Sequence, residues 1–155
     1  MTYNVLRFRP EPVESRILSK MEEAARKNGL GTLPSFFVFI RRQDIIEQLE
    51  LLNDTPDAAL GAPLLVCAFF ALDDETSSQK TLLVLSDMMR IAEENGCAAQ
   101  YVTFVRGVFN NNRYNKLKAA CGVPEGYACV GAISVGMAEK TAETEEKHSF
   151  FSYVQ

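Results

Sequence analysis

An unbroken apolar stretch, residues 62–72, restricts the folds open to this chain. It has about half of the roughly 20 apolar residues that a membrane-spanning helix needs, so it does not predict a membrane protein. A turn with Gly61 and Pro63 precedes its main part, residues 64–72, and an acidic loop follows it, which predicts a strand. Residues 36–40 form a shorter aromatic and β-branched run without alternation, which predicts a strand covered on both faces.

Segments with apolar residues at helical spacing lie before, between and after these strands. Apolar side chains that recur at intervals of three and four predict helices over residues 13–28, 44–52 and 77–95. Asn-Gly pairs close the first and the third of these helices, at a position where a left-handed residue commonly ends a helix. A short helix over residues 113–121 and a strand over residues 128–135 complete the predicted elements.

Two segments show no clear pattern. Residues 101–105 are compatible with a strand or with a packed loop. Residues 138–147 are polar and rich in acidic side chains, and we predict that they form a tail leading to an aromatic terminus. Because no internal repeat or interdomain linker is visible, we predict one α+β domain over residues 1–155.

The charge of the chain argues against nucleic acid as a partner. Its 155 residues include 16 lysines and arginines against 20 aspartates and glutamates, a formal net charge of −4. Binding to a phosphate backbone normally requires a basic face. The N-terminal residues lack the apolar core of an export signal, so we expect neither secretion nor membrane insertion.

Cysteine and histidine are too sparse for a metal site. The four cysteines include no C-x-x-C pair and the only histidine is His148, so we expect no metal. Unpaired thiols fit a reducing compartment, which predicts a cytoplasmic protein. A cysteine nucleophile is disfavoured because no basic residue is adjacent in the sequence. His148 has the right ordinary pKa, about 6.5, for a general acid, but a surface histidine in a tail is the simpler interpretation.

Four ordered stretches together resemble the flavin-dependent nitroreductase family. They are the Arg-Phe-Arg-Pro-Glu-Pro-Val start of the first helix at residues 7–13, the Leu-Gly-Ala-Pro strand entry at 60–66, the turn after the long helix at 95–102, and the Gly-Val-Pro-Glu-Gly-Tyr turn at 122–127, which opens a strand ending in glycine. Each motif alone is common, but their order and spacing are more specific. The resemblance covers nearly the whole chain.

The resemblance implies a fold and an activity. The fold is a nitroreductase-like α+β sandwich of a mostly antiparallel sheet with flanking helices, assembled as an intertwined homodimer with FMN at the interface. NAD(P)H would deliver a hydride to the flavin, which would pass electrons to a nitroaromatic, a quinone or a similar small acceptor. The redox chemistry then belongs to the cofactor, and no catalytic side chain is required.

The resemblance also implies a set of cofactor-binding residues. Arg7 or Arg9 would hold the FMN phosphate, assisted by Lys147, because a guanidinium can bind a phosphate through two parallel hydrogen bonds. The flavin ring would lie against the residues that follow the long helix. The full predicted set is Asn4, Arg7, Arg9, Ser35, Ala99, Gln100, Tyr101, Val102 and Lys147.

Three departures from the family pattern favour an alternative. The usual phosphate-binding arginine and serine are replaced within residues 2–6, the proline–serine segment before the first strand is shortened to 33–35, and the glycine–serine turn has become Gly-Cys-Ala-Ala at 96–99. The alternative is a flavin-free, nitroreductase-like dimeric module with a binding or structural role.

Two apolar surfaces indicate a homodimer. The terminal aromatics Phe150, Phe151 and Tyr153 need a surface to cover them, and the stripe over residues 82–89 offers a second apolar face. A closed dimer uses one self-complementary patch on both chains. A tail folded back on a monomer is the competing interpretation.

Overall fold

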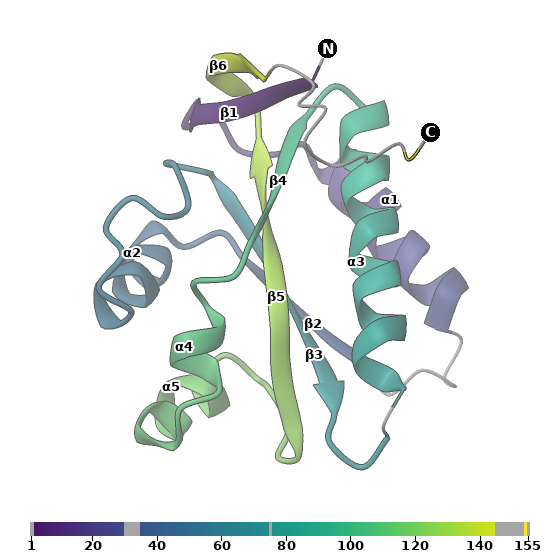
Figure 1. Cartoon of the computed structure of the whole chain (residues 1–155), viewed down its shortest axis with the longest axis vertical. Helices are drawn as coiled ribbons and strands as arrows, with labels where there is room; N and C mark the ends of the chain where they lie inside the picture. The colour runs from purple at the N-terminus through teal and green to yellow at the C-terminus, as the bar shows by residue number, and fades with distance from the viewer. Residues whose placement is uncertain (1, 30–34, 75, 145–153, 155) are drawn as a thin grey trace.

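The computed structural model describes residues 2–29, 35–74, 76–144 and 154. Its main sheet has four strands, all antiparallel to their neighbours, in the order β2-β3-β5-β4 (Figure 1). The strands are β2 (Ser35–Ile40), β3 (Leu64–Ala71), β4 (Ala98–Val102) and β5 (Tyr127–Gly136). Together with the helices they confirm the predicted α+β class.

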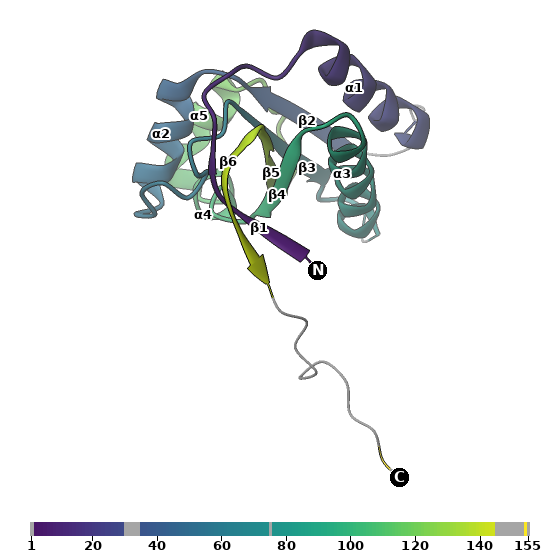
Figure 2. The same ribbon diagram turned by 90° about the horizontal axis from the view of Figure 1, so that it is seen from above.

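Helices cover both faces of this sheet, as Figure 2 shows from above. On one face lie α1 (Ser15–Gly29) and α3 (Ser77–Glu94); on the other lie α2 (Gln43–Leu52), α4 (Arg106–Phe109), the short 3-10 helix η1 (Asn112–Tyr114) and α5 (Asn115–Ala120). Alternate residues of β3 therefore enter two cores. Leu64 and Val66 pack with α1 and α3, and Leu65 and Phe69 pack with α2 and α4.

Most of the predicted elements are confirmed, with ends shifted by a few residues. The apolar runs at 36–40 and 64–72 correspond to β2 and β3, and the three long helical patterns to α1, α2 and α3. The undecided segment 101–105 resolves into the end of strand β4 followed by a turn into α4.

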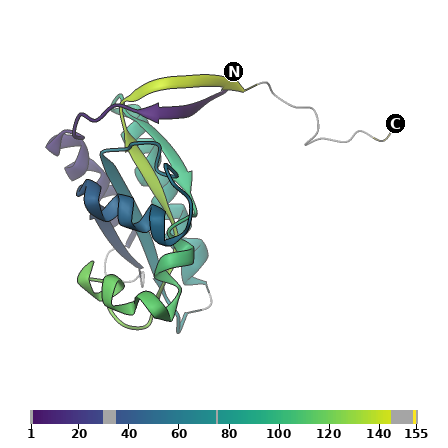
Figure 3. The same ribbon diagram turned by 90° about the vertical axis from the view of Figure 1, so that its left-hand side faces the viewer.

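The prediction of a polar tail over residues 138–147 was wrong for its first part. Residues 138–144 form strand β6 (Ala138–Thr144), which pairs antiparallel with β1 (Thr2–Phe8), from Thr2 opposite Thr144 to Phe8 opposite Ala138 (Figure 3). The polar sequence of β6 carries no apolar alternation, so the sequence pattern did not reveal this strand. Residues 145–153, with Lys147 and the terminal aromatics, lie outside the described residues.

The ribbon of β1 and β6 is attached to one end of the main sheet. The Phe8 N–H donates to the carbonyl of Leu60 at 2.8 Å, and the Arg9 N–H donates to the carbonyl of Met137 at 2.7 Å. Phe8 is 2% exposed and packs with Val5 and Ala62. The ribbon thus lies beside the start of β4 and the end of β5.

Candidate functional site

Strand β4 is an edge strand that offers backbone donors and acceptors to a ligand. Among the described residues it is hydrogen-bonded on one side only, to β5. Alternate residues of such a strand leave both N–H and C=O unpaired on the outer side. Because β1 contacts β4, this edge lies next to the ribbon that carries Arg7. Ala99, Gln100, Tyr101 and Val102 all belong to it.

Tyr101 is held over β5 at a site that only glycine allows. Its hydroxyl donates to the carbonyl of Val130 at 2.9 Å, and its ring lies on Gly131. A Cβ at Gly131 would stand 2.7 Å from Cε2 and Cζ of the ring, and Gly131 has a φ of +149°. The pairing of β5 with β3 shifts register beside Gly131, as in a β-bulge. Gly131 and the hydrogen bond to Val130 therefore fix the position of the Tyr101 ring on the edge strand.

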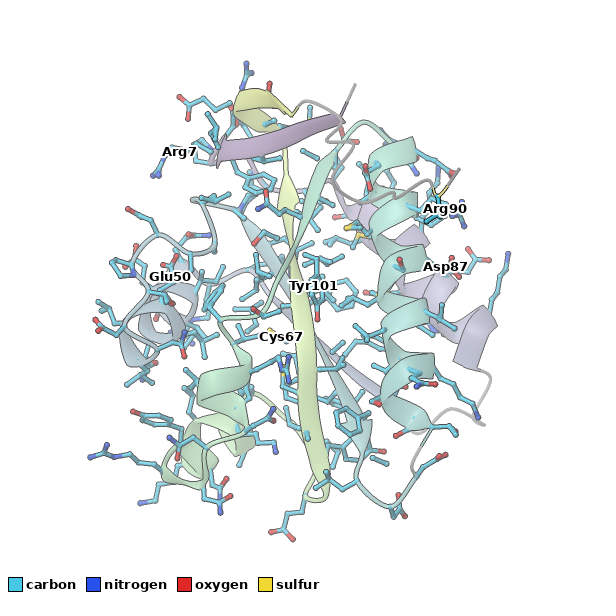
Figure 4. The ribbon with its side chains drawn as sticks, in the orientation of Figure 1. Arg7, Glu50, Cys67, Asp87, Arg90 and Tyr101 are labelled. Atoms are coloured by element: carbon cyan, nitrogen blue, oxygen red, sulfur yellow. The ribbon has the colours of Figure 1, made fainter. Side chains whose placement is uncertain are left out.

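An apolar groove of about 280 Å³ runs between Tyr101 and α3, on the side of the sheet that α3 covers (Figure 4). The groove is open to solvent: Tyr101 is 41% exposed and Leu83 is 70% exposed. Within the predicted stripe over residues 82–89, Leu85 and Met88 are core residues, whereas Leu82 and Leu83 face outward. Exposed apolar surface of this kind is typical of a binding or assembly face.

Two buried polar atoms without hydrogen-bond partners lie between the paired strands β4 and β5. Gln100 stands opposite Ser134 in the pairing of β4 with β5, and both the Gln100 Oε1 and the Ser134 Oγ are buried without a hydrogen-bond partner among the described residues. Buried polar atoms without partners are uncommon in native cores. Gln100 and Ser134 therefore place two polar atoms with free hydrogen-bonding capacity inside the sheet, where β4 pairs with β5.

Arg7 and Arg9 place positive charge at the end of the sheet where the β1–β6 ribbon is attached. Both are exposed, and among the described residues neither forms an ion pair. Arg7 lies over Gly61, where an added Cβ would be 3.3 Å from its Nη2 and 3.4 Å from its Cζ (Figure 4). Gly61 is the last residue of a segment, residues 54–61, within the connection between α2 and β3. An exposed guanidinium without an ion-pair partner suits an anionic ligand.

The structure does not bring Ser35 to this end of the sheet within one subunit. Ser35 pairs with Phe70, five residues along β3 from Leu65, the residue in the same row as Gln100, which is roughly 17 Å. Its hydroxyl lies 2.5 Å from the Thr81 hydroxyl at the start of α3. The backbone of Asn4 pairs with Ala142 in the ribbon, so it belongs to the same end as Arg7.

The sequence analysis did not single out Glu50, a residue of α2 whose side chain contacts the segment 54–61. Its side chain is 7% exposed, and its Oε2 accepts a hydrogen bond from the Ala59 N–H at 2.9 Å. Burial raises the pKa of the Glu50 carboxyl, and the negative charges of Asp57 and Glu47 raise it further. The signal was present in the spacing, because Glu50 follows the core residues Ile46 and Leu49 on the buried stripe of α2.

No activated thiol accompanies the site. All four cysteines are free, and burial raises the pKa of each, for Cys129 to about 12. A thiolate nucleophile requires the opposite shift. Within the described part of the chain, no group of three histidine, cysteine or acidic side chains could hold a metal ion. In the same residues, no helix is long and apolar enough to cross a membrane.

Comparison with known proteins identifies the fold. No family model matches the sequence, and a search of curated proteins also finds no match. Among solved structures, a nitroreductase with bound FMN from Bacteroides fragilis superposes with a TM-score of 0.82 at 15% identity, covering 98% of this chain and 94% of the other. An FMN-dependent nitroreductase from Clostridium difficile gives 0.79 at 13% identity, with 97% and 94% covered. A nitroreductase with bound FMN from Desulfitobacterium hafniense gives 0.78 at 18% identity, with 99% and 94% covered.

These likenesses establish that the chain has the nitroreductase fold along almost its whole length. The resemblance drawn from the four sequence stretches is confirmed at the level of the fold. At identities of 13–18%, the chain is divergent in sequence from each of these structures.

Proposed function

We propose that this protein is an FMN-dependent oxidoreductase that uses NAD(P)H to reduce nitroaromatic compounds, quinones or similar small acceptors. The observation that carries the proposal is an open edge of β4 and the unpaired guanidinium of Arg7 at the same end of the sheet, on a fold shared with nitroreductases that bind FMN. The orphaned polar atoms of Gln100 and Ser134 fit a ligand with a polar ring edge. When bound, FMN would supply the capacity to accept a hydride and to pass electrons on.

The residues of this chain would bind and orient the cofactor. Arg7 and Arg9 supply positive charge for the phosphate, which they can bind through two parallel hydrogen bonds each. Unpaired amides of β4 supply donors for the polar edge of the ring, and the Gln100 side chain supplies an acceptor. Tyr101 fixes an aromatic surface through its bond to Val130. Lys147 and Asn4 remain predicted contributors from the two chain ends.

The flavin content of the purified protein tests this proposal. We expect a yellow protein, or a colourless one that binds added FMN close to one equivalent per chain and then oxidises NADH or NADPH when a quinone or nitroaromatic compound is present. The absorption spectrum and a fluorescence titration give the stoichiometry. A protein that cannot be reconstituted with FMN or FAD at neutral pH rules the proposal out.

A homodimer is part of the proposal. The groove between Tyr101 and α3, together with the exposed Leu82 and Leu83, is an apolar face that a second copy would cover. Ser35, at the far end of the sheet, would contribute to a cofactor site only across such an interface. A two-fold contact would use the same patch on both subunits. The role predicted for the terminal aromatics stays a prediction.

Replacing Leu83 by glutamate should convert the dimer into monomers. A charge in the centre of an apolar contact is buried without a partner on both subunits, which strongly disfavours association. Leu72→Glu is the matched control, since Leu72 is also an exposed leucine, at 64% against 70% for Leu83, but lies outside the groove. Light scattering on the three proteins gives the result. A monomeric parent chain, or a dimer that survives Leu83→Glu, would contradict this interface.

One observation favours a second candidate, a flavin-free dimeric module. The residues at positions 2–6, where the resemblance places the phosphate-binding arginine and serine, are Thr-Tyr-Asn-Val-Leu. This candidate keeps the dimer and the apolar groove but predicts no flavin. The same reconstitution experiment separates the two candidates.

The cytoplasmic location also stays a prediction, and the free thiols are compatible with it.

A further inference from the structure

The segment formed by residues 54–61, within the connection between α2 and β3, has a strained backbone. Asp54, Asp57 and Leu60 have φ values of 55°, 60° and 57°, and Gly61 follows with a φ of 75°. Side chains other than glycine disfavour this left-handed region, and a leucine there is a clear outlier. Such conformations persist only where the surroundings hold them, and they concentrate at functional sites.

Glu50 holds this segment from below. Its Oε2 accepts from the Ala59 N–H at 2.9 Å, and its backbone carbonyl accepts from the Thr55 N–H at 2.9 Å. The side chain is 7% exposed, so solvent offers little replacement for that bond. Gln43 adds a bond from its Nε2 to the carbonyl of Ala62 at 3.0 Å. Glu50 is thus the side chain of α2 that fixes the middle of the segment.

The segment in turn sets the position of Arg7. The carbonyl of Leu60 accepts the bond from Phe8 that anchors β1, and Gly61 is the surface on which the Arg7 guanidinium lies. A movement of Ala59 or Leu60 would therefore move both the backbone of β1 and the guanidinium. Glu50 forms no ion pair with Arg7 among the described residues; the two charges attract each other at longer range, and the contact that Glu50 makes with the segment is its hydrogen bond to Ala59.

We propose that Glu50 is a positioning residue for the anion site of Arg7: its side-chain oxygen, by holding the Ala59 N–H, keeps residues 54–61 in the conformation that places the guanidinium. The identity of the anion, the FMN phosphate, rests on the proposed function. The hydrogen-bond acceptor is what matters here and not the negative charge. A variant that keeps an acceptor oxygen therefore keeps the site, and one that lacks it does not.

Two substitutions of similar volume separate the acceptor from the charge. Glu50→Gln removes the charge and keeps an oxygen, whereas Glu50→Met removes both and remains compatible with burial. Glu47→Gln, on the exposed side of the same helix, is the matched control. We expect Glu50→Met to weaken FMN binding roughly tenfold, the equivalent of one lost hydrogen bond. Glu50→Gln and Glu47→Gln should stay within about threefold of the parent protein.

Amide exchange gives a readout that needs no cofactor. The Ala59 N–H should exchange faster in Glu50→Met than in the parent, Glu50→Gln and Glu47→Gln proteins, because only Glu50→Met leaves it without an acceptor. If no version of the chain binds FMN, the proposed function fails while the exchange rates still decide whether Glu50 holds the segment. Equal exchange at Ala59 in all four proteins overturns the positioning role.

The pH dependence of stability is a second independent readout. The charges that act on the Glu50 carboxyl are Arg7, which favours its ionised form, and Asp57 and Glu47, which oppose it. Because its pKa is raised in the folded state, the parent protein loses stability as the pH rises from about 4.3, the ordinary glutamate value, through the raised pKa. Glu50→Gln lacks this loss, so its advantage over the parent should grow across that window.

The outcomes for FMN binding are also decisive. Weaker binding in Glu50→Met with near-normal binding in Glu50→Gln supports the proposal. Tighter binding in both variants would mean that the Glu50 charge opposes the phosphate and that the hydrogen bond is irrelevant, which overturns it. Unchanged binding in both variants overturns it as well. If Glu50→Met does not fold, Glu50→Gln alone decides. Faster exchange at Ala59 together with weakened FMN binding in Glu50→Gln would also overturn the proposal, because this variant keeps an acceptor oxygen.

Discussion

Replacing Gly131 by alanine is expected to lower the free energy of unfolding by about 2–4 kcal/mol. Two costs combine. A φ of +149° lies in a region that is almost restricted to glycine, which costs about 1–3 kcal/mol for another residue. The new Cβ would also collide with the Tyr101 ring, 2.7 Å from Cε2 and Cζ. Relief of the collision would break the bond from the Tyr101 hydroxyl to Val130, worth about 0.5–1.5 kcal/mol.

A double-mutant cycle separates these two costs. In a Tyr101→Ala background, Gly131→Ala should cost about 1–2 kcal/mol less, because the collision is gone and only the backbone strain remains. Gly122→Ala is the control: it has a φ of +86° and no atom within 4 Å of an added Cβ, so it should cost about 1–2 kcal/mol. Urea denaturation of each variant gives the values. An identical cost for Gly131→Ala in both backgrounds would refute the packing of Tyr101 on Gly131.

Removing both Arg7 and Arg9 is expected to weaken FMN binding more than any other exposed double substitution. Each charged hydrogen bond that is lost should cost about 1.5–3 kcal/mol, more than tenfold in affinity per bond. The expected effect is large because neither guanidinium has a competing ion pair among the described residues. The measurement is a fluorescence titration of FMN against Arg7→Ala/Arg9→Ala.

Arg16→Ala/Arg26→Ala is the matched control for this prediction. It removes the same charge from exposed positions on α1, where both arginines pair with nearby glutamates. Long-range electrostatics would weaken FMN binding in both double variants, whereas direct contact would weaken it only in Arg7→Ala/Arg9→Ala. An affinity that is unchanged in Arg7→Ala/Arg9→Ala refutes the phosphate assignment for both residues.

The helices and central strands could be predicted from the sequence because burial leaves a local pattern. Every residue from Leu64 to Phe69 is buried on one face or the other, which removes polar residues from β3 and makes the apolar run visible. The stripe on α2 likewise follows from helical spacing, with Ile46 and Leu49 fully in the core. Such elements are specified by residues close together in the chain, so their prediction was confirmed.

Strands β1, β4 and β6 could not be predicted in the same way. The β1–β6 ribbon pairs residues 2–8 with residues 138–144, and the sequence of β6 has no apolar run or stripe. Strand β4 exists through its pairing with β5, more than thirty residues further along for most of its length. Neither partner can be found from local spacing, since the pairing is set by the shape of the whole sheet.

The candidate site likewise has features that local sequence predicts and features that depend on the tertiary structure. Sequence by itself determined the residue types that a cofactor site needs, the exposed arginines before the first helix and the strand after the long helix, and it determined the α+β class through the periodicity of burial. The tertiary structure decided which of them share one end of the sheet: it places Arg7, over Gly61, at the end where β4 begins, and Ser35 at the other end. It also decided the contacts that hold these residues in place, the hydrogen bond of Glu50 with Ala59 and the packing of Tyr101 on Gly131. Contacts between distant segments depend on strand pairing and packing, which short-range sequence patterns do not encode.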